Sequence, residues 1–163
     1  MFACRTKSAE DTRELAAVIS QVVRPGDVLL LAGDLGAGKT TFTQGLARAL
    51  GVDGPVTSPT FTLMHEYQAR DFALLHVDVY RLDNLQEVID LAIPELVDDR
   101  AVAVVEWGDV AEAVLPSDTI EVHLTFVADD DDARMVTLRP TGATWMARTT
   151  ALTTSLGRWV VSS

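Results

Sequence analysis

The chain has 163 residues, of which 48% are hydrophobic and 23% are charged. This is the size and composition of one folded domain, and it excludes a disordered chain. Acidic residues outnumber basic residues by 24 to 13, which gives a formal net charge of −11. Because autonomous binding to DNA or RNA requires clustered Lys and Arg, the charge balance argues against it.

Cysteine content and hydropathy exclude two further classes. Cys4 is the only cysteine, so an intramolecular disulfide and a Cys-rich zinc site are ruled out, and we expect an inert thiol near a strand edge. The longest apolar stretches, Val28–Ala32 and Ala101–Val105, are far shorter than the ~20 residues that span a bilayer. The N-terminal residues lead directly into charged residues, without the apolar core of a signal peptide. We therefore expect a cytoplasmic protein that does not associate with membranes.

The first predicted elements are a short strand, a helix and a buried strand. Residues 2–6 are expected to form an edge strand. Ser8 is expected to cap the following helix, with Asp11 three residues later as its capping-box partner. Apolar residues recur at helical spacing over residues 9–23, which predicts an amphipathic helix there. Val28–Ala32 lacks polar alternation, as does a strand that is buried on both faces of a parallel sheet.

The next elements are a helix and a pair of strands. Thr41–Leu50 is predicted to be helical, and Gly51 stands where a helix C-cap belongs. Two strand-like runs, Phe61–Gln68 and Phe72–Tyr80, are joined by only three residues. So short a connection requires the two strands to be antiparallel neighbours.

Two more helices and a second central strand follow. Asn84 is expected to cap a helix that Pro94 limits. Ala101–Val105 is another continuous apolar run, which predicts a second central strand. Asp109 has the cap pattern that precedes a further short helix.

A closing hairpin completes the predicted fold. Its strands are Ile120–Val127 and Arg134–Arg139. Buried strands that alternate with helices predict an α/β fold, with a mostly parallel sheet that carries antiparallel additions. We expect one domain over residues 1–140, followed by a tail over residues 141–163 whose packing the sequence does not decide.

One motif points directly to nucleotide chemistry. Gly33–Thr40 matches the phosphate-binding pattern G-x-x-x-x-G-K-[ST], between a predicted strand and a predicted helix. Glycines let backbone N–H groups converge on phosphate oxygens, and the helix N-terminus adds partial positive charge. Lys39 would contact the terminal phosphates, and the Thr40 hydroxyl would ligate Mg²⁺. The motif predicts a P-loop NTPase-type, three-layer fold. The residues expected to contact the nucleotide are Gly33, Asp34, Leu35, Gly36, Ala37, Gly38, Lys39, Thr40 and Thr41.

Two carboxylates at strand ends are the candidate partners of this loop. Asp78 lies among apolar neighbours, where a carboxylate is costly unless it is paired with a cation. Glu106 ends the second central strand and is positioned to orient a water molecule. We expect Lys39, Asp78 and Glu106 to serve catalysis. Thr40, Asp78 and Glu106 are the candidate metal ligands, and whether Glu106 contacts metal or water stays open. His76 is expected to be a hydrogen-bonded, near-core histidine.

A polar loop is the remaining candidate for the site. The segment Thr57–Thr60 could reach the γ-phosphate or Mg²⁺ through Ser58 and Thr60. Because Ser58 precedes Pro59, its backbone should be extended.

Several nucleotide-dependent functions fit such a site. Guanine specificity usually requires an Asn-Lys-x-Asp motif, but Asn84, the single asparagine, is followed by Leu85. A P-loop kinase of a small metabolite stays open as the alternative, although Arg81 and Arg100 are too dispersed to form a convincing arginine-bearing lid. A docking subunit whose nucleotide-bound state matters more than turnover also stays open.

Four motifs follow one another along the chain. They are Gly-Asp-Leu-Gly-Ala-Gly-Lys-Thr-Thr at 33–41, Val-Thr-Ser-Pro-Thr-Phe-Thr-Leu at 56–63, His-Val-Asp-Val-Tyr-Arg-Leu at 76–82 and Val-Glu-Trp at 105–107. In order and spacing they resemble the bacterial TsaE (YjeE) family, the ATPases of tRNA threonylcarbamoyladenosine biosynthesis. The resemblance covers about residues 8–127, and four co-linear motifs are far more specific than a phosphate-binding loop alone.

The resemblance implies a role for each matched residue. Lys39 and Thr40 would bind phosphate and Mg²⁺, and Asp78 would be the Walker B-like carboxylate. Glu106 together with Trp107 would support hydrolysis, and the polar loop would act as the family's switch-like segment. ATP binding and hydrolysis would drive a complex with the TsaD and TsaB proteins, so tRNA would be contacted only indirectly.

Overall fold

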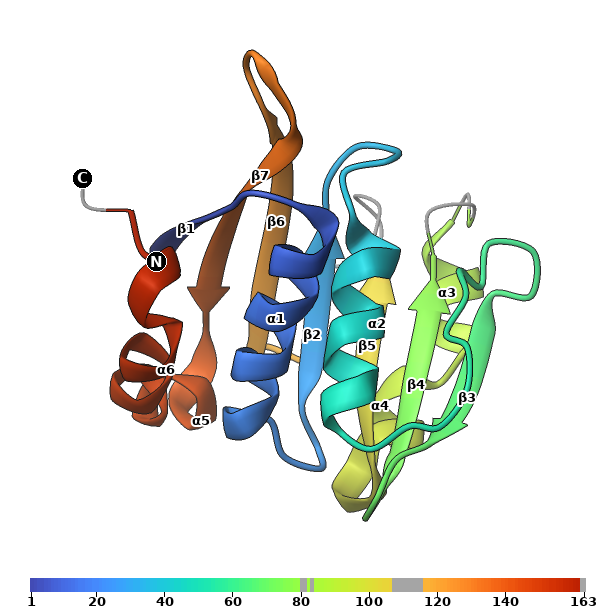
Figure 1. Cartoon of the computed structure of the whole chain (residues 1–163). Coiled ribbons are helices and arrows are strands. Elements are labelled where there is room, and N and C mark those ends of the chain that lie inside the picture. Colours follow the sequence, from blue (N-terminus) through green and yellow to red (C-terminus); the bar gives the residue numbers. More distant parts are fainter. Residues whose placement is uncertain (80–81, 83, 107–115, 162–163) are drawn as a thin grey trace.

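The computed structural model describes residues 1–79, 82, 84–106 and 116–161 (Figure 1). Its strands are β1 (Phe2–Thr6), β2 (Val28–Ala32), β3 (Met64–Gln68), β4 (Ala73–Asp78), β5 (Ala101–Glu106), β6 (Thr119–Val127) and β7 (Asp130–Pro140). Its α-helices are α1 (Ala9–Ile19), α2 (Lys39–Ala49), α3 (Leu85–Asp90), α4 (Ile93–Val97), α5 (Gly142–Ala147) and α6 (Thr149–Leu156). Among the described residues, none of the helices has the length and apolar character needed to cross a membrane.

The strands form a single seven-stranded sheet in the order β1-β7-β6-β2-β5-β4-β3. β2 lies between β6 and β5 and is parallel to both, and β4 is parallel to β5. β7 and β3 run antiparallel to the strands beside them. The predicted mostly parallel sheet with antiparallel additions is confirmed.

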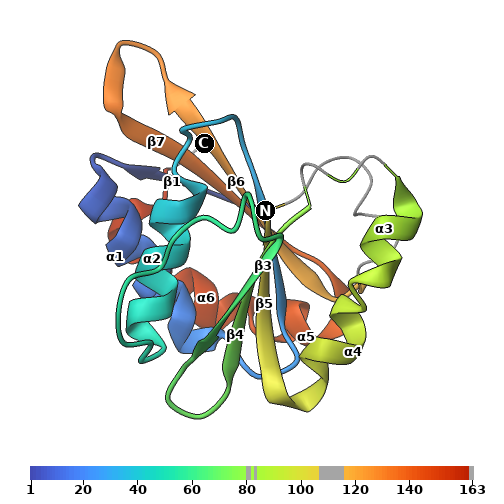
Figure 2. The same cartoon turned by 90° about the vertical axis from the view of Figure 1, so that its right-hand side faces the viewer.

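Helices cover both faces of this sheet, which makes three layers (Figure 2). Leu29 and Leu31 of β2 face the core beneath α1, α2 and α6, whereas Val28 and Leu30 face the core beneath α3 and α4. Successive side chains of a strand point to opposite faces, so a strand buried on both sides must be apolar throughout. The continuous apolar run of β2 therefore explains its central place.

The first predicted elements are largely confirmed. β1 is an edge strand, and the Ser8 hydroxyl accepts a hydrogen bond from the Asp11 N–H at 3.1 Å as the cap of α1. The α-helix ends at Ile19 rather than at residue 23, and residues 20–22 form a 3₁₀ turn. The Ser20 hydroxyl donates to the Ala17 carbonyl, a local bond of the kind that competes with helix propagation.

Two predicted boundaries in the middle of the chain were wrong. β3 begins at Met64 and not at Phe61, because the Leu63 N–H donates to the Pro59 carbonyl in a turn and Leu63 has a positive φ of 66°. Asn84 caps α3 as predicted, but this helix already ends at Asp90. Pro94 instead lies in the first turn of α4, where its missing N–H breaks no helical hydrogen bond.

The segment after Thr141 packs onto the rest of the molecule. α6 lies beside α1 (Figure 1), and Trp145, Leu152, Leu156 and Trp159 are buried in the same core as α1 and α2. Asp118 accepts hydrogen bonds from the N–H groups of Thr144 and Trp145 at the start of α5. Burial alone would raise the pKa of Asp118, but the hydrogen bonds from Thr144 and Trp145 and the charge of Arg148 lower it below its usual value.

Cys4 is expected to resist alkylation in the folded protein. Its side chain is fully buried, and burial raises the pKa of the Cys4 thiol to about 11 because the thiolate is poorly solvated there. At pH 8, iodoacetamide should therefore label the native chain far more slowly than the urea-unfolded chain, as measured by mass spectrometry. Equal labelling rates in the two states would contradict this burial.

Candidate functional site

A tight loop connects β2 to α2 at the carboxyl edge of the sheet. Gly38 has φ of +108° and directly precedes α2, a backbone conformation that side chains with a Cβ rarely adopt. A Cβ on Gly33 would lie 2.4 Å from the Leu124 carbonyl oxygen of β6, so only glycine fits there. The predicted order of strand, glycine-rich loop and helix is thus confirmed.

Lys39 lies at the first position of α2 with its side chain folded over the loop. Its Nζ donates hydrogen bonds to the carbonyl oxygens of Gly33 at 2.7 Å and Asp34 at 3.1 Å. Thr40 follows in the same helical turn. The ammonium group and the helix N-terminus therefore place positive charge at the same loop, as an anion site requires.

Asp78 and Glu106 end the two strands on one side of this loop. They are register partners at the carboxyl ends of β4 and β5, and Glu106 is also the partner of Leu31, two residues before Gly33. Both carboxylates are 6% exposed. The predicted meeting of these residues at the loop edge is what parallel pairing of β2, β5 and β4 produces.

The Glu106 carboxylate contacts a buried histidine. His76 is fully buried on β4, and its Nε2 lies 2.8 Å from Oε1 of Glu106. His76 is therefore a hydrogen-bonded core histidine, as predicted. Its partner was not predicted, because the two residues are 30 positions apart and meet only through strand pairing.

The polar loop between α2 and β3 reaches the same edge. Ser58 and Thr60 share a hydrogen bond of 2.6 Å between their hydroxyl groups, and the buried Pro59 lies between them. Further along, the Leu63 carbonyl accepts a hydrogen bond from the Asp78 N–H at 2.8 Å, which fixes the end of this segment beside β4.

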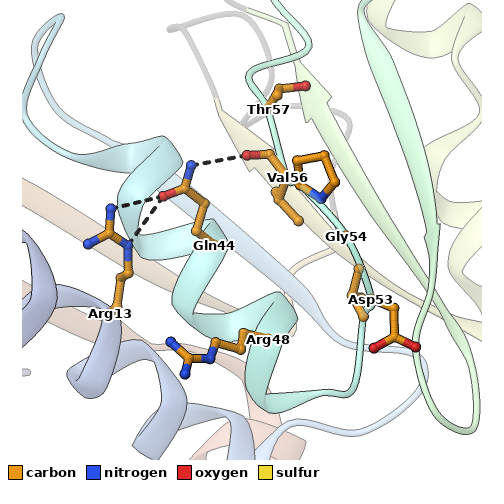
Figure 3. Close-up of a pocket in the computed structure, with 9 residues that line it drawn as sticks. Arg13, Gln44, Arg48, Asp53, Gly54, Val56 and Thr57 are labelled. Carbon is orange, nitrogen blue, oxygen red and sulfur yellow. Dashed lines mark hydrogen bonds between the residues drawn. The ribbon is translucent and has the colours of Figure 1, made fainter.

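Gln44 of α2 connects this loop to α1 (Figure 3). Its Oε1 accepts from Nε and a terminal nitrogen of Arg13, and its Nε2 donates to the Val56 carbonyl at 3.0 Å. These residues line a groove of about 500 Å³ together with Arg48 and other residues of segment 52–57. No motif of the sequence indicated this connection.

An arginine from β7 contacts the Gly33–Thr40 loop on its other side. Arg134 Nε donates to the Ala37 carbonyl at 3.0 Å, and its guanidinium lies 4.6 Å from the ring centroid of Phe126. A small hollow of about 100 Å³ adjoins this contact, between Thr12 of α1 and Thr41 of α2. Because β6 and β7 flank β2 on the side opposite β5, Arg134 is not adjacent to Glu106.

The predicted site residues fall into two groups. The structure brings together the loop residues, Asp78 and Glu106 at one sheet edge, with the segment that contains Ser58 and Thr60 joined to β4 at that edge. Trp107 and the predicted helix after Asp109 lie outside the described residues. Arg134 was missed, and its separation of 97 residues from Ala37 left no local pattern to find it.

The chain matches one family by its family model and by its individual relatives. Residues 6–136 match the family model described as "Threonylcarbamoyl adenosine biosynthesis protein TsaE". The chain is similar to the tRNA threonylcarbamoyladenosine biosynthesis protein TsaE of Bacillus subtilis, with 42% identity over 127 residues that cover 78% of this chain and 79% of the relative. The Streptomyces coelicolor protein of the same name is 41% identical over 138 residues, covering 82% and 93%.

A solved structure agrees with these sequence matches. The crystal structure of Bacillus subtilis YdiB superposes with a TM-score of 0.77 at 34% identity and covers 93% of each chain. The P-loop NTPase fold predicted from the sequence is therefore confirmed. The match of the family model over most of the chain, with this fold, shows that the chain belongs to the TsaE family of tRNA threonylcarbamoyladenosine biosynthesis proteins.

Proposed function

We propose that this chain binds ATP with Mg²⁺, hydrolyses it slowly on its own, and acts as the ATP-hydrolysing subunit that drives TsaD and TsaB in threonylcarbamoyladenosine modification of tRNA. The observation that carries the proposal is the convergence of three strand ends. The loop after β2, Asp78 at the end of β4 and Glu106 at the end of β5 lie at one sheet edge. Phosphoryl transfer relies on such positioning of a phosphate cradle and acidic groups.

The residues at this edge fit a bound Mg²⁺. Mg²⁺ prefers oxygen ligands and is usually held by one or two protein groups together with phosphate oxygens and water. Thr40 is the last residue of the Gly33–Thr40 loop, and the Asp78 carboxylate lies buried at the end of β4, beyond β5 on the same sheet edge. Two buried carboxylates in register, Asp78 and Glu106, also favour a cation nearby. When bound, the metal would neutralise charge on the phosphate oxygens.

Each remaining residue has a role in the proposed reaction. Lys39 would hold the terminal phosphates, and the backbone N–H groups of the loop would cradle them. Glu106 would orient the attacking water through the carboxylate oxygen that His76 does not contact. Ser58 and Thr60 would contribute hydroxyl groups from the switch-like loop. The acidic net charge of −11 suits a subunit that acts on partner proteins while others hold the RNA.

Partner-dependent hydrolysis tests this function. The isolated chain should hydrolyse ATP very slowly, because fast P-loop hydrolysis needs an arginine on the transferred phosphate, and Arg134, the arginine described at the loop, is bound to the Ala37 carbonyl. Purified TsaD and TsaB should raise the rate about tenfold or more. Glu106→Ala should lose this rise and still bind ATP by calorimetry. The matched control Glu121→Ala removes a glutamate of β6 that pairs with Arg139 at the surface, and it should behave as the wild type.

Three outcomes would overturn the proposal or part of it. Rapid turnover without partners, with the phosphoryl group appearing on a small acceptor, would identify a metabolite kinase instead. A Glu106→Ala protein that hydrolyses ATP and supports repeated cycles of tRNA modification like the wild type would remove Glu106 from the reaction. Full modification with a non-hydrolysable ATP analogue would reduce the chain to a docking subunit.

A further inference from the structure

His76 is a fully buried histidine that the proposed ATPase roles leave without a function of its own. It lies two residues before Asp78 on β4, so both side chains point to the same face of the sheet. Glu106 of the neighbouring strand lies on that face too, and its Oε1 is 2.8 Å from His76 Nε2. The three groups therefore lie on one face at the carboxyl ends of two adjacent strands, where His76 and Glu106 are in contact.

The direction of the hydrogen bond follows from the chemistry of the carboxylate. As the carboxylate that its proposed role requires, Glu106 only accepts hydrogen bonds, so the donor of this bond is the Nε2–H group of His76. Nδ1 of the same ring has no hydrogen-bond partner among the described residues, although it is buried. A buried ring nitrogen without a partner costs free energy that an apolar side chain would avoid. What the histidine offers at this position is its bond to Glu106.

We propose that His76 is a positioning residue, which acts through Glu106 and does not touch the substrate. A glutamate has three side-chain torsions, and its carboxylate can occupy many positions unless it is held. The bond from Nε2 holds Oε1, which leaves Oε2 as the oxygen that orients the attacking water. Orientation of a reacting group within a narrow range of geometry is a large part of catalysis by such sites. The inference rests on the proposed function and adds to it the group that places the catalytic carboxylate.

Two conservative variants separate positioning from simple burial. The side-chain nitrogen of glutamine lies about as far along the side chain as Nε2, so His76→Gln can still donate to Glu106. The nitrogen of asparagine corresponds to Nδ1, so His76→Asn keeps an amide but loses the bond. With TsaD and TsaB present, His76→Asn should lower kcat for ATP about tenfold, and His76→Gln should stay within about threefold of the wild type. KM and the calorimetric Kd for ATP should change little in either variant.

A double-mutant cycle and a spectroscopic measurement complete the test. If His76 acts through Glu106, His76→Asn should cause no further loss of kcat in a Glu106→Gln background. The Nε2–H resonance of His76, observed in the isolated chain labelled with ¹⁵N-histidine, should shift in Glu106→Gln. Circular dichroism should show each variant to be folded. If His76→Asn destabilises the core, the comparison of His76→Gln with the wild type still tests the proposal.

Failure of the positioning role of His76 can be told apart from failure of the proposed ATPase function. A wild-type chain that partners do not stimulate would overturn the proposed function and the positioning role with it. A stimulated wild type whose Glu106→Ala variant is inactive, together with a fully active His76→Asn, would overturn the positioning role alone. So would equal losses in His76→Gln and His76→Asn, or additive losses in the cycle, because either would show that His76 contributes to packing only.

Discussion

Replacing Lys39 with alanine is expected to abolish ATP binding or to weaken it about tenfold or more. A hydrogen bond between charged groups contributes about 1.5–3 kcal/mol, and about 1.4 kcal/mol corresponds to a factor of ten in affinity. In the structure, Nζ of Lys39 already lies over the loop and donates to the carbonyl oxygens of Gly33 and Asp34. Little ordering of the side chain is then required when phosphate binds, so its removal should cost most of this energy. Isothermal titration calorimetry with ATP measures the change directly.

The chain offers a matched control for this substitution. Lys7 is the only other lysine, and its side chain is exposed before the start of α1. Lys7→Ala therefore makes the same chemical change and removes the same charge from a chain with net charge −11, away from the loop. It should leave the affinity for ATP unchanged. An unaltered affinity in a folded Lys39→Ala protein would contradict the assignment of Gly33–Thr40 as a phosphate-binding loop.

Replacing Arg148 with alanine is expected to destabilise the fold by about 3–5 kcal/mol, because it leaves a buried charge without its partner. Two nitrogens of Arg148 donate to the two carboxylate oxygens of Asp27 at 2.7 Å, and both side chains are buried. The same guanidinium also donates to the Val22 carbonyl and lies over the Trp145 ring. Urea unfolding measured by circular dichroism gives the change in free energy of unfolding.

An exposed ion pair on the same segment is the control. Arg158 pairs with Asp11 and Glu14, but its side chain is 62% exposed, so Arg158→Ala should cost no more than about 1 kcal/mol. Replacing both members of the buried pair, as in Asp27→Leu with Arg148→Met, should recover much of the lost stability because no buried charge then remains. Equal costs for Arg148→Ala and Arg158→Ala would show that the ion pair does not hold α5 and α6 to the sheet.

The sequence by itself determined the glycine-rich loop at Gly33–Thr40 and the strand before it. The conformation of this loop depends on glycines within eight consecutive residues, so a local pattern is enough to predict it. The continuous apolar run of β2 can be buried on both faces only at the centre of a parallel sheet. Asp78 and Glu106 were also within reach of prediction, because the carboxyl ends of parallel strands meet at one edge.

Only the tertiary structure decided which polar groups pair with one another. His76 and Glu106 are 30 residues apart, Arg134 and Ala37 are 97 apart, and Arg148 and Asp27 are 121 apart. Local patterns record backbone conformation and burial, whereas these pairs depend on strand order, on register and on the docking of the last two α-helices. A histidine, an arginine or an aspartate in an apolar run shows that a partner is needed. Its identity follows only when the sheet and its layers have been assembled.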